Sequence, residues 1–531
     1  MNQTCRQCNT TFEITDQDRK FYQSFDVPAP ELCPDCRLQR RMAWRNDRTF
    51  YVRKCDLSGQ QFVSTYPSVT PFPVYQPSVW YGDQWDPTSY GQDIDFTRPF
   101  FEQWHDLMQK VPRLGIDIIN CENSDYCNYC GDDKNCYLDI AGEANEDCYY
   151  NLFTKYSKNC VDCTFVYNSE LCYEAVSCYH CHSVLYASYL DDCINCIFSY
   201  DLKSCHDCSF STNLRHKSYY LFNKPYSQTD YRKEIKKLQL DTNQGWQTAI
   251  QRYQKLLREQ AIHRAAYIVN SEQCTGNDIK NCHNVEQAFN VTNCENSKYL
   301  YDVLDAKDCY DLNYSLYDPE SAYELISTLN LRYSAFSQAS HYCYNIFYCD
   351  QCNNSSDLFG CIGLNKKKYC IFNKQYSAVD YQQLKQKLIE HMKVTGEWGE
   401  FFPAQLSPFA YNETVAQEYM PLTKNDCLQR GWRWGESKVV DATFQKSSLL
   451  CTICNRYFKT IPQELRFYTQ LHVPSPTICP NCRHSSRLQR RNPRRLWQRS
   501  CSNCQATIMS SYAPNRSEKV YCDQCYQREI Y

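Results

Sequence analysis

The feature that most constrains this chain of 531 residues is a set of cysteine pairs that occurs near both ends, at a constant offset of 446 residues (from position 5 to position 451). The N-terminal cysteines and their C-terminal counterparts are, in order, Cys5, Cys8, Cys33, Cys36 and Cys451, Cys454, Cys479, Cys482. Aromatic, proline and arginine positions around them recur at the same offset without a gap, from Phe12 and Phe458 to Tyr66 and Tyr512. The two ends are therefore copies of one module.

Each cysteine set has the spacing of a metal site. Two C-x-x-C pairs place two pairs of thiolates on two knuckles, which fold together around one tetrahedral Zn²⁺. A second set follows in the C-terminal copy: Cys501, Cys504, Cys522 and Cys525. We predict three structural zinc sites, with iron in a rubredoxin-like role or paired disulfides as the alternatives. Because thiolates fill all four positions of each site, no open position remains to activate water.

The N-terminal copy of the second set has lost its ligands. Only Cys55 remains a cysteine, and the other three positions are Ser58, Gln76 and Val79. One thiol with these neighbours cannot hold zinc tightly. We expect aromatic packing to replace the metal there, by Tyr75, Trp80, Tyr81 and Trp85.

An arginine-rich segment follows the second knuckle of each module. Residues 37–53 carry about +5 and residues 483–499 about +7, which leaves about −15 on the rest of a chain whose total is −3. The arginines that the spacing places on one face of a short helix are Arg37, Arg40, Arg41, Arg45 and Arg48, then Arg483, Arg487, Arg490, Arg491, Arg494 and Arg495. Pro493 is expected to break or kink the second helix. Such a surface is typical of phosphate contact in nucleic acids, with a solvated basic face or docking on the acidic centre of the same chain as alternatives.

The centre of the chain repeats every 12 residues. Cysteines recur at this step in three series, namely Cys136, Cys148, Cys160, Cys172; Cys181, Cys193, Cys205; and Cys196, Cys208. Short strands at a fixed period indicate a β-solenoid, with 12 or 24 residues per coil and a register that slips between Cys172 and Cys181. We interpret the inner cysteines as small apolar filler. Extra zinc sites (from Cys127 with Cys130, or from Cys193, Cys196, Cys205 and Cys208) and redox-active disulfides are the alternatives.

The predicted fold is mainly β with α-helices, with two β-solenoid-like domains between zinc-ribbon or treble-clef-like modules. The second solenoid copies the first at an offset near 150, as Tyr173-Glu174 and Tyr323-Glu324 show, and a helix closes each copy. The expected parts are an N-terminal zinc module (1–90), a linker with a helix (91–117), the first solenoid (118–228), a helical segment (229–267), the second solenoid (268–378), a helix with a linker (379–446) and a C-terminal double zinc module (447–531). The N-terminus lacks the apolar region of a signal peptide and no run of 18 apolar residues occurs, so we expect a cytoplasmic protein.

Several strings resemble those of one protein family. They are CPDCRLQRR at 33–41, WDP at 85–87, RPFFEQ at 98–103, KNCYL at 134–138, GEFFP at 399–403 and SPFAYN at 407–412. In combination they are similar to a family of cysteine-rich zinc-ribbon proteins, without an established activity, from small-genome candidate bacterial lineages. Some members are labelled as CoA transferases, but no residue pattern in this chain supports that label. The resemblance implies an architecture and no reaction.

No residue set in the sequence defines a reaction, and with only 14 glycines the chain has no glycine-rich phosphate loop. The first hypothesis is a non-enzymatic, zinc-stabilised scaffold that binds nucleic acid, either RNA, including the ribosome, or DNA, through the arginine segments. The alternative is a protein-interaction platform that uses a solenoid surface rich in Tyr, Asn and Asp. A third is an enzyme, either a β-helix acting on carbohydrate or a thiol-redox protein. Glu174 and Glu324 are its candidate carboxylates, although turn hydrogen bonds fit them better, since they lie in separate solenoids.

Overall fold

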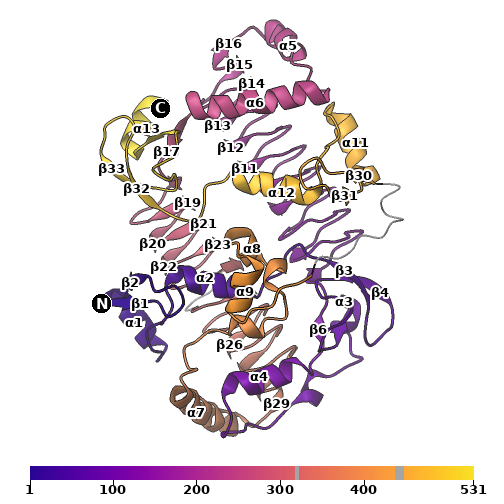
Figure 1. Ribbon diagram of the computed structural model, residues 1–531, viewed down its shortest axis with the longest axis vertical. Coiled ribbons are helices and arrows are strands. Elements are labelled where there is room, and N and C mark those ends of the chain that lie inside the picture. The colour runs from indigo at the N-terminus through magenta and orange to yellow at the C-terminus, as the bar shows by residue number, and fades with distance from the viewer. Residues whose placement is uncertain (312, 317–321, 437–447) are drawn as a thin grey trace. The chain divides into compact units, whose positions relative to one another are not determined.

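A computed structural model describes residues 1–311, 313–316, 322–436 and 448–531 of the chain (Figure 1). The chain forms two compact units, and each unit combines two distant stretches of sequence. Unit 1 comprises Met1–Ile116 and Tyr267–Glu436, and unit 2 comprises Asp117–Ala266 and Ser437–Tyr531. Each unit therefore contains one terminal cysteine module and one of the two central repeats. The fold is mixed α and β, with many short strands in small sheets.

The central repeat of unit 2 is a series of parallel strands, which we call the first stack. Its strands are β7 (Ile118–Ile119), β8 (Cys130–Gly131), β9 (Leu152–Lys155), β10 (Thr164–Tyr167), β11 (Val176–Tyr179), β12 (Ser188–Asp191), β13 (Tyr200–Lys203), β14 (His206–Ser209) and β15 (Ser218–Leu221). Paired residues are 12 positions apart, as in Thr164 with Val176 and Val176 with Ser188. Isolated parallel bridges with the same offset join the strands' flanks, as in Glu122 with Lys134. The repeat length is therefore 12 residues and not 24.

A second period of three residues lies inside each 12-residue repeat. From Asn120 to Phe222, every third residue has a left-handed backbone conformation, with φ between 47° and 62°. Asn and Asp tolerate this conformation better than other non-glycine residues, and they occupy many of these positions. The next residue in each triplet faces the interior, as buried Cys136 after Asn135 illustrates. Each repeat therefore has four inward positions.

The expected slip of the register is wrong. Bridges at an offset of 12 continue through the segment, from Glu170 to His182 and from Tyr173 to Leu185. Cys172 and Cys181 are both buried, but they occupy different inward columns of the stack. The cysteine series changes column there while the backbone register does not change.

The central repeat of unit 1 is the second stack. Its strands are β18 (Ile268–Val269), β19 (Gly276–Lys280), β20 (His283–Glu286), β21 (Ala288–Thr292), β22 (Glu295–Lys298), β23 (Tyr301–Leu304), β24 (Asn313–Leu316), β25 (Ile326–Leu329), β26 (Tyr344–Phe347), β27 (Ser356–Phe359) and β28 (Lys368–Ile371). Most paired residues are again 12 apart, as in Tyr301 with Asn313. The offset is 11 between Ile268 and Ile279 and 13 between Tyr310 and Tyr323. The second stack is therefore the less regular copy.

Helices follow the last strand of each stack, as predicted. In unit 2, β16 (Lys224–Pro225) precedes α5 (Gln228–Lys236) and α6 (Asn243–Glu259), and in unit 1, β29 (Lys374–Gln375) precedes α7 (Ala378–Thr395). Ser227 and Ser377 cap α5 and α7 by accepting from the backbone N–H groups of Asp230 and Asp380. The helical segment expected at 229–267 is too long. Residues Ile262–Arg264 form β17, which pairs with β34 (Lys519–Tyr521) of the C-terminal module.

The two terminal modules have matching elements in matching order. The N-terminal copy contains β1 (Asn2–Thr4), β2 (Thr11–Glu13), α1 (Asp16–Ser24), α2 (Pro34–Met42), β3 (Tyr51–Lys54) and β4 (Gln61–Ser64). Their counterparts are β30 (Leu449–Leu450), β31 (Tyr457–Phe458), α11 (Pro462–Leu471), α12 (Pro480–Gln489), β32 (Trp497–Ser500) and β33 (Thr507–Ser510), followed by β34 and α13 (Asp523–Ile530). Helix α12 ends before Pro493, so this proline neither breaks nor kinks it.

Unit 1 contains several further short elements. They are β5 (Val74–Tyr75), α3 (Pro77–Trp80), a 3₁₀ turn (Pro87–Tyr90), α4 (Phe100–Met108), β6 (Arg113–Leu114), two more 3₁₀ turns (Ala404–Leu406 and Tyr411–Glu413), α8 (Val415–Tyr419) and α9 (Lys424–Gln429). Trp104 of α4 is fully buried in the aromatic core of unit 1 with Phe402. Among the described helices, none combines the length and the apolar character needed to cross a membrane.

We predict that the close strand contact at Gly276 tolerates only glycine. Gly276 has a φ of 144°, and an added Cβ would lie 1.7 Å from the carbonyl oxygen of Ala288. The Gly276→Ala variant should lose about 2–4 kcal/mol of stability through strain and steric overlap, measured by urea unfolding. Gly131→Ala is the matched control, because no atom lies within 4 Å of its added Cβ. Equal effects in both variants would contradict this account.

Candidate metal centres

The structure brings together each of the three predicted cysteine sets. The groups are Cys5, Cys8, Cys33 and Cys36; Cys451, Cys454, Cys479 and Cys482; and Cys501, Cys504, Cys522 and Cys525. Within each group the four Sγ atoms lie within 4.8 Å of one another. A cluster of four thiolates at this separation can hold one tetrahedral metal ion. The sequence therefore identified all twelve converging cysteines.

Local structure aims the thiols at one point. The first pair of each group lies on a tight knuckle that contains a left-handed residue: Asn9, Asn455 or Gln505. The second pair begins a helix, with Cys33, Cys479 and Cys522 at the N-caps of α2, α12 and α13. A helix N-terminus favours negative charge and so favours the thiolate form. The knuckle and the helix together place two thiols from each pair on the same centre.

Backbone amides prepare the first cysteine of each C-terminal set for ligation. Burial raises the pKa of Cys451, but backbone hydrogen bonds from Cys454 and Cys479 outweigh it and lower the pKa to about 6. Burial and the amides of Cys504 and Cys522 do the same at Cys501, whose pKa is also about 6. The Cys479 amide lies 3.3 Å from the Cys451 Sγ atom. These two sulfurs are therefore favoured as thiolates at neutral pH before any metal binds.

An aromatic cluster occupies the position of the lost fourth set. Cys55 is buried with Tyr75 and Trp80, and Trp85 packs against this cluster. The expectation of aromatic packing is confirmed for these residues. Tyr81 is different, because it is 39% exposed and contacts only the edge of the cluster, at the Trp80 ring. Hydrophobic packing therefore stabilises this part of the N-terminal module.

In unit 1, the arginines of α2 insert into the second stack. The Arg37 Nε atom lies 2.8 Å from a carboxylate oxygen of Asp311, and both side chains are fully buried. The Arg41 guanidinium donates to Asn313 and lies 3.4 Å from Asp311. Burial lowers the pKa of Arg37, but Asp311 outweighs that effect and holds it well above its ordinary value. These guanidinium groups therefore remain charged inside the protein and fasten the module to the stack.

Unit 2 repeats this arrangement. Arg483 and Arg487, the counterparts of Arg37 and Arg41, contact the two oxygens of Asp162 at 2.8 Å and 2.6 Å. All three side chains are at most 1% exposed. The Arg487 group also donates to the carbonyl oxygen of Tyr150. The internal duplication therefore includes both the arginine-bearing helix and the acidic site that receives it.

The two internally repeated glutamates complete these docking sites. Glu324 accepts from Arg40 at 2.7 Å in unit 1, and Glu174 accepts from Arg490 at 2.7 Å in unit 2. Arg40 and Arg490 are not equivalent in the repeat, so each unit reaches its glutamate from a different position of the arginine segment. Each glutamate is engaged in ion pairing within its own unit. Neither provides the free carboxylate that a hydrolytic pair requires.

The placement of the arginines corrects the expected phosphate-binding surface. Seven of them are buried or nearly so and cannot reach a phosphate in this structure: Arg37, Arg40, Arg41, Arg45, Arg483, Arg487 and Arg490. Arg45 pairs with Asp47 at 2.6 Å. Arg48, Arg491 and Arg494 are partly buried and have partners, whereas Arg495 is exposed. The alternative of docking on the acidic part of the same chain accounts for the buried group.

The inner cysteines of the stacks are buried thiols that pack as core. Cys160 and Cys172 belong to one buried cluster of the first stack, together with Val166 and Leu190. The Cys160 Sγ atom donates to the carbonyl oxygen of Lys158 at 3.5 Å, and the same local contact recurs along the stack. The structure records each cysteine as a free thiol. Among the described residues, the four cysteines once considered for an extra zinc site do not converge (Cys193, Cys196, Cys205 and Cys208).

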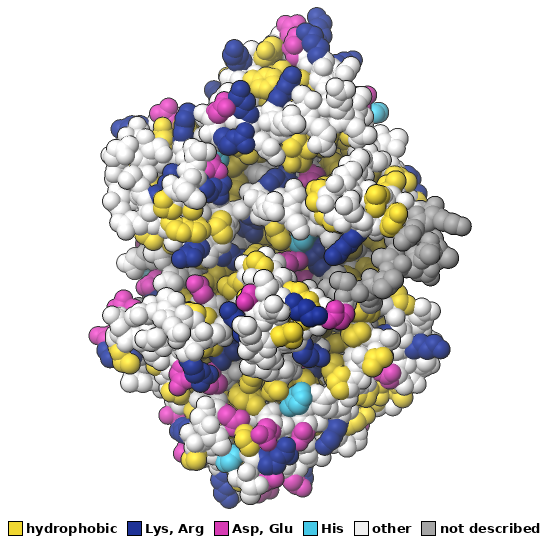
Figure 2. Space-filling view, in the orientation of Figure 1, with side chains coloured by type: hydrophobic (Ala, Val, Ile, Leu, Met, Phe, Trp, Pro, Cys, Tyr) yellow, Lys and Arg dark blue, Asp and Glu magenta, His cyan; other side chains and the backbone are white. Residues whose placement is uncertain are grey.

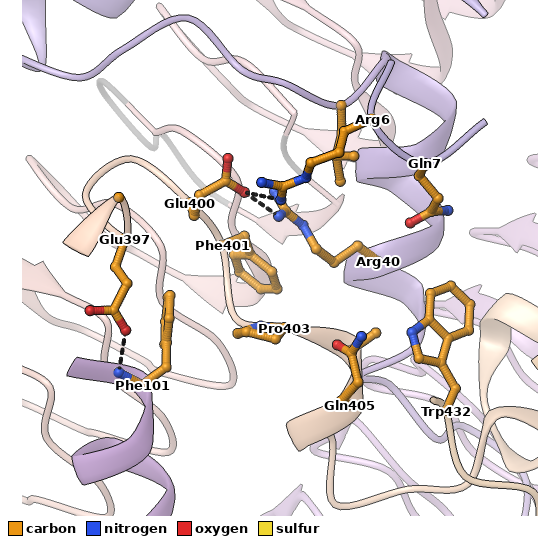
Figure 3. Close-up of a pocket in the computed structure, with 13 residues that line it drawn as sticks. Arg6, Gln7, Arg40, Phe101, Glu397, Glu400, Phe401, Pro403, Gln405 and Trp432 are labelled. Atoms are coloured by element: carbon orange, nitrogen blue, oxygen red, sulfur yellow. Dashed lines mark hydrogen bonds and ion pairs between the residues drawn. The ribbon is translucent and has the colours of Figure 1, made fainter. Parts of the chain in front are cut away.

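A pocket of about 330 Å³ in unit 1 lies beside the first metal group (Figure 3). Glu400 lies between two guanidinium groups, 2.6 Å from Arg40 and 3.9 Å from Arg6, which belongs to the knuckle between Cys5 and Cys8. Glu397 accepts hydrogen bonds from the backbone N–H groups at the start of α4, including that of Phe101. Both carboxylates of the pocket therefore have structural partners. The sequence gave no signal for this pocket, since its lining comes from segments far apart along the chain.

No protein-family model matches the chain, and no curated protein is significantly similar to it. Function is therefore inferred from the geometry alone.

We predict that each terminal cysteine group binds its own metal ion. Cys451→Ser and Cys501→Ser should each lower the metal content by one ion per chain, because three thiolates hold the ion far more weakly than four. Mass spectrometry of the purified protein would count the metals. Cys55→Ser is the control and should leave the count unchanged, since Cys55 lies among aromatic side chains. An unchanged count in all three variants would contradict the prediction.

We predict that the buried arginines stabilise the protein. Arg487→Met leaves Asp162 and Glu174 short of a buried positive charge and should cost about 3–5 kcal/mol in urea unfolding. Arg495→Met removes an exposed arginine from the same segment and should change stability by about 0.5 kcal/mol or less. Similar stabilities for the two variants would show that the buried ion pairs contribute nothing specific.

Proposed function

We propose that the protein is a non-enzymatic scaffold, stabilised by zinc, that binds a protein partner through exposed tyrosines of its second stack. The observation that carries this proposal is the division of the polar side chains. The arginines expected to face a ligand are used internally, whereas tyrosines of the second stack are exposed. The protein alternative of the two leading hypotheses therefore fits the geometry better than the nucleic-acid one.

We further propose that each stack is a β-solenoid with one coil per 12 residues. The support is the constant parallel offset together with four left-handed residues and four inward positions in every repeat. A solenoid of this kind offers a regular outer surface that extends with the number of coils. Ladders of asparagine follow that surface, as in Asn281, Asn293 and Asp305, where each amide donates to the next residue of the column. The surface is therefore rigid and repetitive.

Zinc is the metal that fits the terminal groups best. Four thiolates in a compact cluster favour Zn²⁺, or iron in a rubredoxin-like site, over metals that prefer oxygen ligands. A fully thiolate-coordinated zinc ion has no open position, so we assign these ions a role in folding and none in catalysis. Such an ion contributes on the order of 10 kcal/mol to the folding of a small module.

The proposed binding surface is a patch of three tyrosines, Tyr333, Tyr342 and Tyr344. They are 52%, 54% and 50% exposed. The rings of Tyr333 and Tyr344 lie 5.6 Å apart, edge to face. Tyrosine is enriched in protein interfaces because a rigid ring provides contact area while its hydroxyl remains available for hydrogen bonding. We call these three residues the tyrosine patch.

Nucleic-acid binding is the second candidate. It has support from Arg495, which is exposed after α12, but it loses the seven arginines that pair inside the units. On the face drawn in Figure 2, Lys and Arg side chains are scattered among Asp and Glu and form no continuous basic surface. A polyanion site usually gathers many cations on one face. This candidate therefore needs fewer and weaker phosphate contacts than the sequence suggested.

We predict that a protein partner is lost when the tyrosine patch is removed. Full-length protein isolated from its own cells should retain the partner after nuclease treatment and at high salt, and changing the three tyrosines of the patch to serine should abolish the association. Tyr156→Ser is the control, because Tyr156 is 51% exposed in the first stack. Association that nuclease or salt removes, and that persists in the triple variant, would favour nucleic acid instead.

A further inference from the structure

The interior of the first stack contains one strongly acidic position. Cys130, Asp133 and Asp139 occupy inward positions near the start of the stack and are 4%, 1% and 0% exposed. One ligand atom from each residue lies within 4.8 Å of the other two. Elsewhere the inward positions of this stack are mainly thiol, aliphatic or hydroxyl side chains. Two carboxyl groups in such an interior require a physical explanation.

The two carboxyl groups are only half satisfied. Asp133 accepts from the backbone N–H of Asn145 at 3.0 Å, and Asp139 accepts from the Asn145 side-chain amide at 2.9 Å. The second oxygen of each, Oδ2 of Asp133 and Oδ1 of Asp139, is buried without a hydrogen-bond partner. Neither residue takes part in an ion pair with any of the described side chains. A buried, unpaired carboxyl oxygen is costly, so a missing cation or proton is expected beside it.

Gly142 leaves room beside these oxygens. It lies one 12-residue repeat after Cys130 and is itself at an inward position. A Cβ added there would lie 2.5 Å from Asp139 Oδ2 and 2.8 Å from Asp133 Oδ2. The backbone of Gly142 is not in the left-handed region, so its conformation alone does not require glycine. The glycine is therefore explained by the space that the acidic cluster needs.

We propose that Cys130, Asp133 and Asp139 bind a divalent transition-metal ion inside the first stack. One sulfur and two carboxylate oxygens form a mixed donor set that suits Zn²⁺, Fe²⁺ or Co²⁺, whereas Mg²⁺ and Ca²⁺ avoid sulfur ligands. The thiol of Cys130 donates to the carbonyl oxygen of Asp139 at 3.1 Å and loses its proton to solvent when the ion binds. This site is separate from the three terminal groups and does not depend on the proposed partner.

A shared proton is the competing explanation. Burial raises the pKa of Asp133 to about 6, and burial followed by the charge of Asp133 raises the pKa of Asp139 well above its ordinary value. A proton between the two carboxyl groups would relieve the repulsion that a metal ion otherwise relieves. The two explanations differ in the number of metal ions per chain, which is measurable.

The test counts metal ions in the full-length protein after loading with Zn²⁺ under reducing conditions and dialysis. The wild-type protein should hold four ions per chain, and the Asp133→Asn/Asp139→Asn variant should hold three. Cys148→Ser changes a buried inward thiol outside the cluster, and should retain four. Circular dichroism would establish that the variants are folded.

Three results would overturn the proposal. One is a wild-type count of three, which assigns the carboxyl pair a shared proton. Another is a count of four in the double asparagine variant, and a third is a count of three in Cys148→Ser; both would place the additional ion elsewhere. Should the double variant fail to fold, Cys130→Ser takes its place, because it removes the only sulfur ligand and preserves the shape of the interior. A fall from four to three in that variant supports the site, and no change overturns it.

Discussion

The contact on which each unit depends is a buried carboxylate of a stack held by two arginines of a terminal module. Asp311 serves Arg37 and Arg41 in unit 1, and Asp162 serves Arg483 and Arg487 in unit 2. A buried charge of either sign is expensive alone, so neither the module nor the stack can present its half of the contact without the other. Arginine suits this role because its planar fork engages two oxygens at once and stays charged when buried.

The stacks obey a different constraint, which is the small size of their interior. A turn at every third residue leaves one inward side chain per side of each 12-residue repeat, as Cys136 and Cys148 illustrate. Small polarizable thiols fill such a space without strain and donate weakly to nearby carbonyl groups. The left-handed turns favour Asn and Asp at the corners, which then form outer ladders such as Asn293 with Asp305. One backbone geometry therefore explains both the cysteine and the asparagine content.

The metal modules show how duplication and divergence act on stability. Three cysteine groups retain four converging thiols, whereas the fourth position has replaced its ligands by packing of Tyr75 and Trp80 around Cys55. Both solutions fix a short two-stranded element that has too little core to hold itself together. Once the module is folded, its helix delivers arginines to the stack. Metal ligation at the ends therefore supports ion pairing in the interior of each unit.

The sequence by itself determined the twelve terminal cysteine ligands, the duplication of the modules and the 12-residue period, because each of these depends on spacing within a short segment. It also predicted helices after each stack, although it extended one of them across β17. Only the tertiary structure decided where the arginines go. Arg37 and Asp311 are 274 positions apart and Arg487 and Asp162 are 325 apart, and no local pattern relates such residues. The convergence of Cys130, Asp133 and Asp139 likewise required the three-residue turn geometry, since inward and outward positions alternate in a period that hydrophobicity alone does not show.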